Sequence, residues 1–141
     1  MAESTLAVEH LFTITAKTAK GLPVTGGPQG SRVVVPVTGG SFKGARLEGT
    51  VAEAPGGDWV TVRADGSIRL DVRILLQTND GANILVTYSG IGNRVDGELQ
   101  LRTAPQFETG DERYAWLNNV QAVGIGTSGG GEVQYEVYRL L

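Results

Sequence analysis

Apolar and polar residues alternate through the middle of the chain, from Asp58 to Ser89 (DWVTVRADGSIRLDVRILLQTNDGANILVTYS). Alternation over short β-rich runs is typical of strands that bury one face. Two turns divide the stretch, Ala64-Asp65-Gly66 and Asn79-Asp80-Gly81. Asp-Gly favours a tight hairpin because glycine accepts the positive φ that such turns need. The pattern predicts an antiparallel meander of three strands. They cover residues 58–64, 67–78 and 82–89.

The same kind of pattern recurs on both sides of this meander. It predicts further strands over residues 6–16, 32–37, 45–52, 98–103, 114–126 and 132–140. Glycine, proline and short polar residues between them predict loops. The predicted loops cover residues 20–31, 38–44, 90–97 and 104–113, the last with room for one short helical turn. The chain has 21 glycines among 141 residues, which agrees with many turns and no helix.

About nine strands without a helix predict an all-β protein. An open antiparallel sheet exposes unpaired edges, and closure into a barrel removes them. Barrels of about eight strands have an interior that side chains fill or that holds one small ligand. We therefore predict one domain over residues 1–141, a closed antiparallel up-and-down β-barrel of about 8–10 strands, lipocalin-like or allene-oxide-cyclase-like in shape. A sandwich of two sheets is the alternative.

Composition narrows the function by exclusion. The net charge is −3 without a basic cluster, so we expect neither nucleic acid nor a membrane surface as a partner. There is no cysteine, and the single histidine, His10, has no spacing typical of a metal site. Gly124-Ile-Gly126 precedes no helix and is not a dinucleotide motif. We expect no metal and no cofactor, and the lack of a signal peptide in the first ten residues predicts a cytoplasmic protein.

Three segments resemble the family known as domain of unknown function 3237. They are GDWVTVRADGSIRLDVRILLQTNDGANILVTYSG, RTAPQFETGDERYAWLN and VGIGTSGGGEVQYEVYRL. The most specific element is Tyr-x-Trp-Leu-Asn, at Tyr114, Trp116, Leu117 and Asn118. The resemblance implies a small closed antiparallel barrel, usually self-associated, from bacteria or fungi. It implies no established catalytic chemistry.

The orientation of the central predicted strand decides where chemistry is possible. Side chains alternate between two faces. One face carries Ile68, Leu70, Val72, Ile74 and Leu76; the other carries Arg69, Asp71, Arg73, Leu75 and Gln77. In one arrangement the aliphatic face fills the core and the charges meet water, as charged residues usually do. In the other, the polar face lines a cavity.

We predict the second arrangement, with the polar face inward. Asp71 and Arg73 lie two residues apart on one face and can form a charge-assisted pair. The segments that resemble the family also centre on these polar residues. The aliphatic face then needs cover from protein, so we predict a homodimer or a higher homo-oligomer.

The inward polar face defines a set of candidate site residues. Arginines would hold a carboxylate, phenolate or enolate, Asp71 would orient an arginine or act as a base, and a tyrosine would donate to a carbonyl. The catalytic candidates are Asp71, Arg73 and Tyr88. The substrate-binding candidates are Trp59, Arg63, Arg102, Tyr114, Trp116 and Asn118.

These residues predict a small-molecule-binding barrel. We expect a cofactor-independent enzyme of the isomerase, cyclase or lyase type that acts on a small aromatic or polyketide-like carbonyl compound. Donors aimed at a developing oxyanion would supply the catalysis. The alternatives are a non-catalytic ligand carrier or sensor that uses the same pocket, and a structural oligomeric barrel with a filled lumen.

Overall fold

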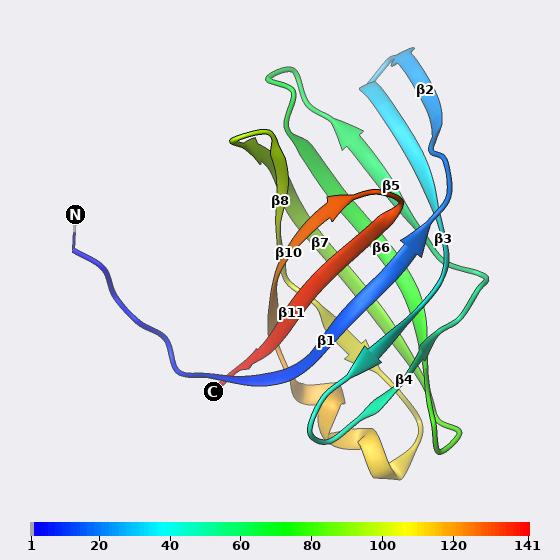
Figure 1. Cartoon of the computed structure of the whole chain (residues 1–141), viewed down its shortest axis with the longest axis vertical. Helices are drawn as coiled ribbons and strands as arrows, with labels where there is room; N and C mark the ends of the chain where they lie inside the picture. The colour runs from blue at the N-terminus through cyan, green and yellow to red at the C-terminus, as the bar shows by residue number, and fades with distance from the viewer. Residues whose placement is uncertain (1) are drawn as a thin grey trace.

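A computed structural model describes residues 2–141 as eleven strands and one short 3-10 helix (Figure 1). The strands are β1 (Val8–Thr18), β2 (Leu22–Gly27), β3 (Gly30–Lys43), β4 (Glu48–Val51), β5 (Gly57–Val62), β6 (Ile68–Thr78), β7 (Asn83–Val95), β8 (Glu98–Thr103), β9 (Gln106–Glu108), β10 (Ala122–Gly129) and β11 (Glu132–Leu140). The helix η1 (Glu112–Asn119) lies between β9 and β10. Within residues 2–141, no helix is long and apolar enough to cross a membrane.

All strands belong to one sheet, and every pairing is antiparallel. The pairings run from β6 through β5, β3, β1, β11, β10, β8 and β7, and β7 pairs with β6 again. Strand β2 pairs with β3, β4 pairs with both β3 and β6, and β9 pairs with β7. Figure 1 shows the sheet curled into a barrel-like shape, with η1 at its lower end. The predicted all-β antiparallel class is confirmed.

The central meander forms as the alternation predicts. At its first turn the Gly66 amide donates to the Arg63 carbonyl at 3.0 Å, with a φ of 87° at Gly66. At the second, the Gly81 amide donates to the Thr78 carbonyl at 3.0 Å, with a φ of 94° at Gly81. Strands β5, β6 and β7 therefore pair in sequence through the two Asp-Gly turns.

The core lies on the inner face of the sheet and fills its lower half. The aromatic ring of Phe12 packs edge-on against Phe42 and Phe107, with ring centroids 5.5 and 6.1 Å away. Leu117 of η1 and Leu76 of β6 are fully buried beside them. Toward the upper end, where the hairpins β2–β3, β5–β6 and β7–β8 turn, the inner face is mainly aliphatic.

Several predicted loops are strands instead. Residues 90–97 continue β7 to Val95, and Asp96-Gly97 makes the turn into β8 with φ angles of 53° and 82°. Residues 20–31 form the β2–β3 hairpin, and β3 runs on through 38–44 to Lys43. Glycines on these segments marked bends inside long strands rather than breaks between strands.

The prediction of one strand over residues 114–126 is wrong. Residues 112–119 form the helix η1, which begins where the Asp111 carboxylate accepts from the Arg113 amide at 2.9 Å. In this helix the buried residues, Tyr114 and Leu117, lie three positions apart, as the 3-10 period requires. Only Ala122–Gly129 is extended, as β10.

Replacing Gly40 by alanine is expected to lower the free energy of unfolding by about 2–4 kcal/mol. Gly40 has a φ of 134°, and a Cβ there would lie 2.0 Å from the Thr15 carbonyl oxygen of β1, a backbone atom that has no room to move. Gly129→Ala is the control, because nothing lies within 4 Å of its Cβ position. Urea denaturation of both variants checks this, and equal stabilities would contradict it.

Candidate functional site

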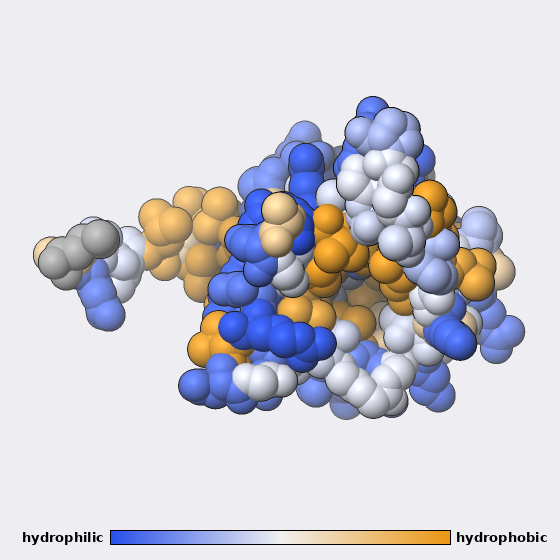
Figure 2. Space-filling view, turned by 90° about the horizontal axis from the view of Figure 1, so that it is seen from above, coloured by the Kyte–Doolittle hydropathy of each residue, from blue (hydrophilic) through white to orange (hydrophobic). Residues whose placement is uncertain are grey.

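The upper half of the sheet encloses a cavity of about 420 Å³. Figure 2, seen from above, shows apolar residues lining a hollow between the hairpins. Its wall is aliphatic: β3 contributes Val33, Val35 and Val37, and β6 contributes Leu70, Val72 and Ile74. Binding pockets for small molecules have this size and apolar character, with a few polar groups that fix orientation.

Asp58 is the one carboxylic acid among the residues within 2–141 that line this cavity. It lies on the inward face of β5 with Val60 and Val62. The pairing of β5 with β6 is interrupted between Asp58↔Val72 and Thr61↔Arg69. In this interruption the Asp71 amide donates to Asp58 Oδ1 at 3.0 Å. A main-chain donor thus holds the carboxyl in the wall of the cavity.

Burial raises the pKa of Asp58 to about 6. The hydrogen bond from the Asp71 amide opposes this shift, because it stabilises the carboxylate, and the negative charge of Asp71 adds to it. A group with a pKa near neutrality exists in both protonation states under ordinary conditions. Asp58 has the protonation behaviour of a general acid–base group.

Two tyrosines lie opposite and beside this carboxyl. Asp58 pairs with Val72 and Val72 with Tyr88, so their inward side chains form one row across β5, β6 and β7. Neighbouring strands are about 4.8 Å apart, which puts the Asp58 and Tyr88 backbones about 10 Å apart. The Tyr88 ring meets the Tyr135 ring of β11 edge-on, with centroids 5.6 Å apart. Together they line the cavity near Asp58.

Both tyrosine hydroxyls are hydrogen-bond donors at neutral pH. Burial raises the pKa of Tyr88 and of Tyr135 well above the ordinary range, and the charge of Asp58 raises both further. The Tyr135 hydroxyl is buried and has no hydrogen-bond partner within residues 2–141. A bound molecule with a carbonyl or phenolic oxygen would satisfy it. One titratable carboxyl and two neutral donors can move a proton and stabilise an oxyanion.

The predicted orientation of β6 is wrong. Its aliphatic residues face the cavity and core, while Asp71 and Arg73 are exposed on the outer surface. The charges stay hydrated, and the aliphatic residues leave water, so this is the arrangement of lower free energy. The aliphatic face of β6 already packs inside the protein, so it needs no cover from a second copy of the chain. The argument for self-association from this face therefore no longer applies.

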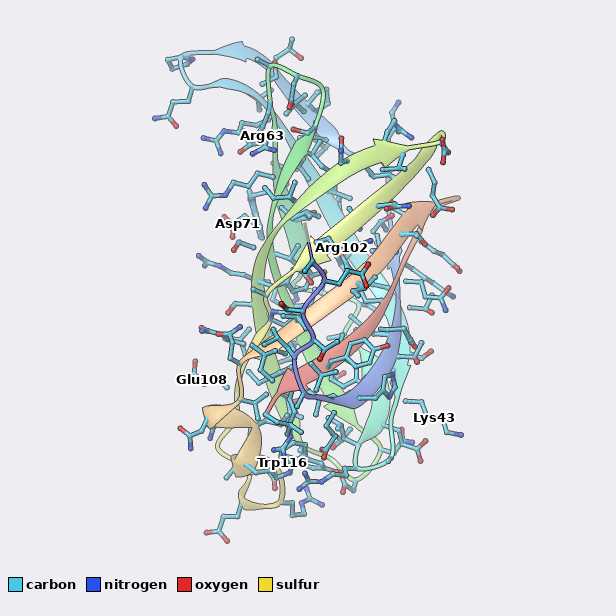
Figure 3. The ribbon with its side chains drawn as sticks, turned by 90° about the vertical axis from the view of Figure 1, so that its left-hand side faces the viewer. Lys43, Arg63, Asp71, Arg102, Glu108 and Trp116 are labelled. Carbon is cyan, nitrogen blue, oxygen red and sulfur yellow. The ribbon has the colours of Figure 1, made fainter. Side chains whose placement is uncertain are left out.

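The neighbouring candidates also lie outside the cavity. Trp59 is 45% exposed on the outer face of β5. Arg63 donates to Ser67 Oγ at 2.9 Å, and Arg102 to the Leu101 carbonyl at 2.9 Å. Figure 3 shows Arg63 and Asp71 projecting outward from the ribbon, and Arg102 is exposed as well. Of the nine candidates, Tyr88 alone lines the cavity.

The Tyr-x-Trp-Leu-Asn element holds the lower end of the sheet together. The Tyr114 hydroxyl donates to Asp80 Oδ2 of the β6–β7 turn at 2.7 Å. Asn118 Oδ1 accepts from the Thr109 amide at 2.8 Å, and its Nδ2 donates to the Thr109 carbonyl at 3.0 Å. These contacts fasten η1 to two loops.

Trp116, on the same helix η1, also packs at the lower end of the sheet. The guanidinium of Arg46 lies 3.6 Å from the centroid of its ring, and Trp116 packs against the core on its other side. Figure 3 places Trp116 at the lower end, remote from the hairpin end that opens into the cavity. The geometry therefore assigns Tyr114, Trp116 and Asn118 to the closure of the lower end rather than to the cavity.

Sequence reasoning missed Asp58, Tyr135 and Arg94, which all line the cavity. A signal for the first was present, because Asp58 shares its face with Val60 and Val62. A lone acid on an apolar face is an informative exception. Assigning Trp59 to the interior put this face outside and hid the exception.

Fold and cavity define the class: a small all-β, barrel-like protein with an internal cavity that contains one carboxyl and two tyrosines. Residues 6–140 match the family described as "Protein of unknown function (DUF3237)". The chain belongs to this family, which confirms the resemblance in its sequence.

Two relatives match nearly the whole chain. A UPF0311 protein of Rhodopseudomonas palustris (strain TIE-1) is 30% identical over 151 residues, 97% of this chain and 98% of that protein. The crystal structure of a β-barrel-like protein from Acinetobacter baumannii superposes with a TM-score of 0.90 at 30% identity, covering 99% of both chains.

A fungal relative is named as an enzyme. The hydroalkoxylation enzyme phnH of Penicillium herquei is 46% identical over 89 residues, 62% of this chain and 52% of that protein. The crystal structure of an enzyme from Penicillium herquei has a TM-score of 0.75 at 31% identity, covering 100% of this chain and 99% of that one.

Tyr114→Phe is expected to cost about 1–2 kcal/mol of stability, because it removes a hydrogen bond to a carboxylate. Tyr138→Phe is the control, since no hydrogen bond of its hydroxyl occurs within residues 2–141 and its ring packs edge-on against His10. Thermal and urea denaturation measure both. A Tyr114→Phe variant as stable as the control would contradict the structural role.

Asp58→Asn is expected to change how stability depends on pH. The folded pKa of Asp58, about 6, is raised, so its protonated form stabilises the fold below about pH 4. That contribution is lost as the pH rises through 6. Relative to Asp58→Asn, the natural protein should lose about 2–3 kcal/mol between pH 4 and pH 7. Urea titrations across this range measure the difference, and a flat difference would contradict the shift.

Proposed function

We propose that the chain is a cofactor-independent acid–base enzyme that works inside a closed β-barrel. The eight strands β1, β3, β5, β6, β7, β8, β10 and β11 would form the barrel, and their circuit of pairings supports this closure. One observation carries the proposal: Asp58, with its pKa raised to about 6, lines an apolar cavity together with Tyr88 and Tyr135. The substrate class is a small aromatic or polyketide-like carbonyl compound.

The proposed chemistry is a proton-neutral rearrangement. Asp58 as carboxylate takes a proton from a substrate O–H or C–H, and as carboxylic acid it returns that proton to a carbon. Tyr88 and Tyr135 donate hydrogen bonds to the oxygen on which negative charge develops. Such acid–base transfer contributes about 10²–10⁴-fold to a rate, and one oxyanion donor about 3 kcal/mol.

The fungal relative supports one form of this reaction. Hydroalkoxylation, after which the Penicillium herquei enzyme is named, adds an O–H group across a C=C bond. With a phenol next to a carbonyl-conjugated alkene, the base removes the phenolic proton and the oxygen attacks the β-carbon. The resulting enolate is held by the tyrosines, and the α-carbon takes the proton back. The product is an isomer of the substrate, so no oxidant, reductant or cofactor is consumed.

The apolar wall adds to this chemistry. Valines and leucines around Asp58 keep bulk water away from the enolate and strengthen each hydrogen bond to it. A non-catalytic carrier would use the same wall for binding. The enzyme and the carrier differ in their need for Asp58: the enzyme requires it for turnover, and the carrier does not.

The test uses a hydroxyaryl enone, a chalcone with a phenol ortho to its carbonyl, as the probe. The protein should accelerate its cyclisation to a product of the same mass, with one deuterium at the α-carbon in D₂O. Asp58→Asn should lower kcat by at least about 100-fold with KM within a few-fold, because binding is retained and proton transfer is lost.

Arg102→Gln is the matched control, since Arg102 is an exposed charge on the outer face. It should leave kcat and KM unchanged. An unchanged kcat in Asp58→Asn would remove the base from the mechanism. Binding of a panel of such enones without any turnover would favour the carrier.

A further inference from the structure

The inward face of β7 carries a cation at the open end of the cavity. Along this face Tyr88 is followed by Gly90, Gly92 and then Arg94. The two glycines add no side chain to the lumen, and a Cβ on Gly92 would lie 2.6 Å from Ile68 Cγ1. Six residues of strand span about 20 Å. Arg94 and Tyr88 therefore lie at opposite ends of a segment of β7 whose inward positions carry no side chain.

Arg94 is the one basic residue among those within 2–141 that line the cavity. Its neighbour across the ladder is Leu99, and Leu99 pairs in turn with Ser128 of β10. This row lies at the mouth, and Arg94 and Ser128 both line the cavity there.

The guanidinium of Arg94 is open to a ligand. Within residues 2–141 it forms no ion pair, and its hydrogen bond is a long one, 3.4 Å from Nη1 to the Gly97 carbonyl. A guanidinium presents a planar fork of donors that matches the two oxygens of an acid group. Most of those donors are free for such a group.

The two charges of the cavity have opposite signs at different depths. Asp58 repels an anion from the inner part when it is ionised, and Arg94 attracts one at the mouth. An apolar molecule with an acidic group at one end therefore has one favourable orientation. Its acidic oxygens meet Arg94, and its opposite end meets the Asp58, Tyr88 and Tyr135 side chains.

We infer that Arg94 is a specificity-determining residue that selects substrates with a terminal acidic group, a carboxylate or a phenolate, on an apolar aromatic body. This inference rests on the proposed function for the location of the reacting end. It adds the substrate class, an amphipathic aromatic acid, and the direction in which it enters.

The test compares two fluorescent probes with the same ring system, anilinonaphthalene sulfonate and phenylnaphthylamine, which lacks the sulfonate. Arg94→Gln should weaken binding of the sulfonate about tenfold, as expected for loss of one charge-assisted contact. Binding of the neutral probe should stay within about twofold, since the apolar wall is unchanged. Arg94→Lys should recover part of the loss because it restores the charge.

Arg102→Gln is again the control, because it removes an arginine from the outer face of the adjacent strand β8. It should change neither affinity. An equal loss for both probes in Arg94→Gln, or no loss for the sulfonate, would overturn the inference while leaving the lumen as a binding site.

A blocking variant separates this failure from failure of the proposed function. Leu70→Trp fills the cavity from β6, and Val62→Trp does so at the mouth, where the side chain is 36% exposed and a large residue disturbs the fold less. Both should abolish binding of both probes. Unchanged binding in a blocked and folded variant would show that the lumen binds neither, and both proposals would fall.

Discussion

Burial of the aliphatic face of β6 is the interaction on which the rest of the structure depends. Leu70, Val72 and Leu76 are at most 4% exposed, and each contributes about 1.5–3 kcal/mol by leaving water. Asp71 and Arg73 remain hydrated on the other face. A shift of one residue would exchange the two faces and lose both terms. The wall of the lumen is therefore apolar, and its polar groups have to come from other strands.

The two ends of the sheet differ in how completely side chains fill them. The lower end is filled by Phe12 and its aromatic neighbours and is fastened by Tyr114 of η1 to the β6–β7 turn. At the upper end, β3 presents valines and β7 presents Gly90 and Gly92, so side chains fill less of the space. Tight packing at one end supplies the stability that a hollow at the other end lacks. The site lies in the half where packing is incomplete.

Much of the meander was predictable because alternation and Asp-Gly turns are local signals. The inward face was not, because a period of two defines two faces without saying which one is buried. The Tyr-x-Trp-Leu-Asn element imitates alternation, yet its buried residues, Tyr114 and Leu117, follow a 3-10 period. Asp58 is recognisable only once its face is known to be internal. Fold class thus depends on local patterns, while the site depends on which surfaces meet in space.

Asp71 acts on the proposed site from outside the cavity: its main-chain amide donates to Asp58 and lowers the Asp58 pKa, while its negative charge raises that pKa. Burial alone would keep Asp58 protonated, and full hydration would keep it ionised. The Asp71 amide, freed by the interrupted pairing of β5 with β6, offsets part of the burial and leaves the pKa near 6. At Tyr88 and Tyr135 burial is the dominant cause of the raised pKa, so both hydroxyls remain neutral donors. The two ladder pairs missing between β5 and β6 thus leave the Asp71 amide free to donate to Asp58, the one carboxyl that lines the cavity within residues 2–141.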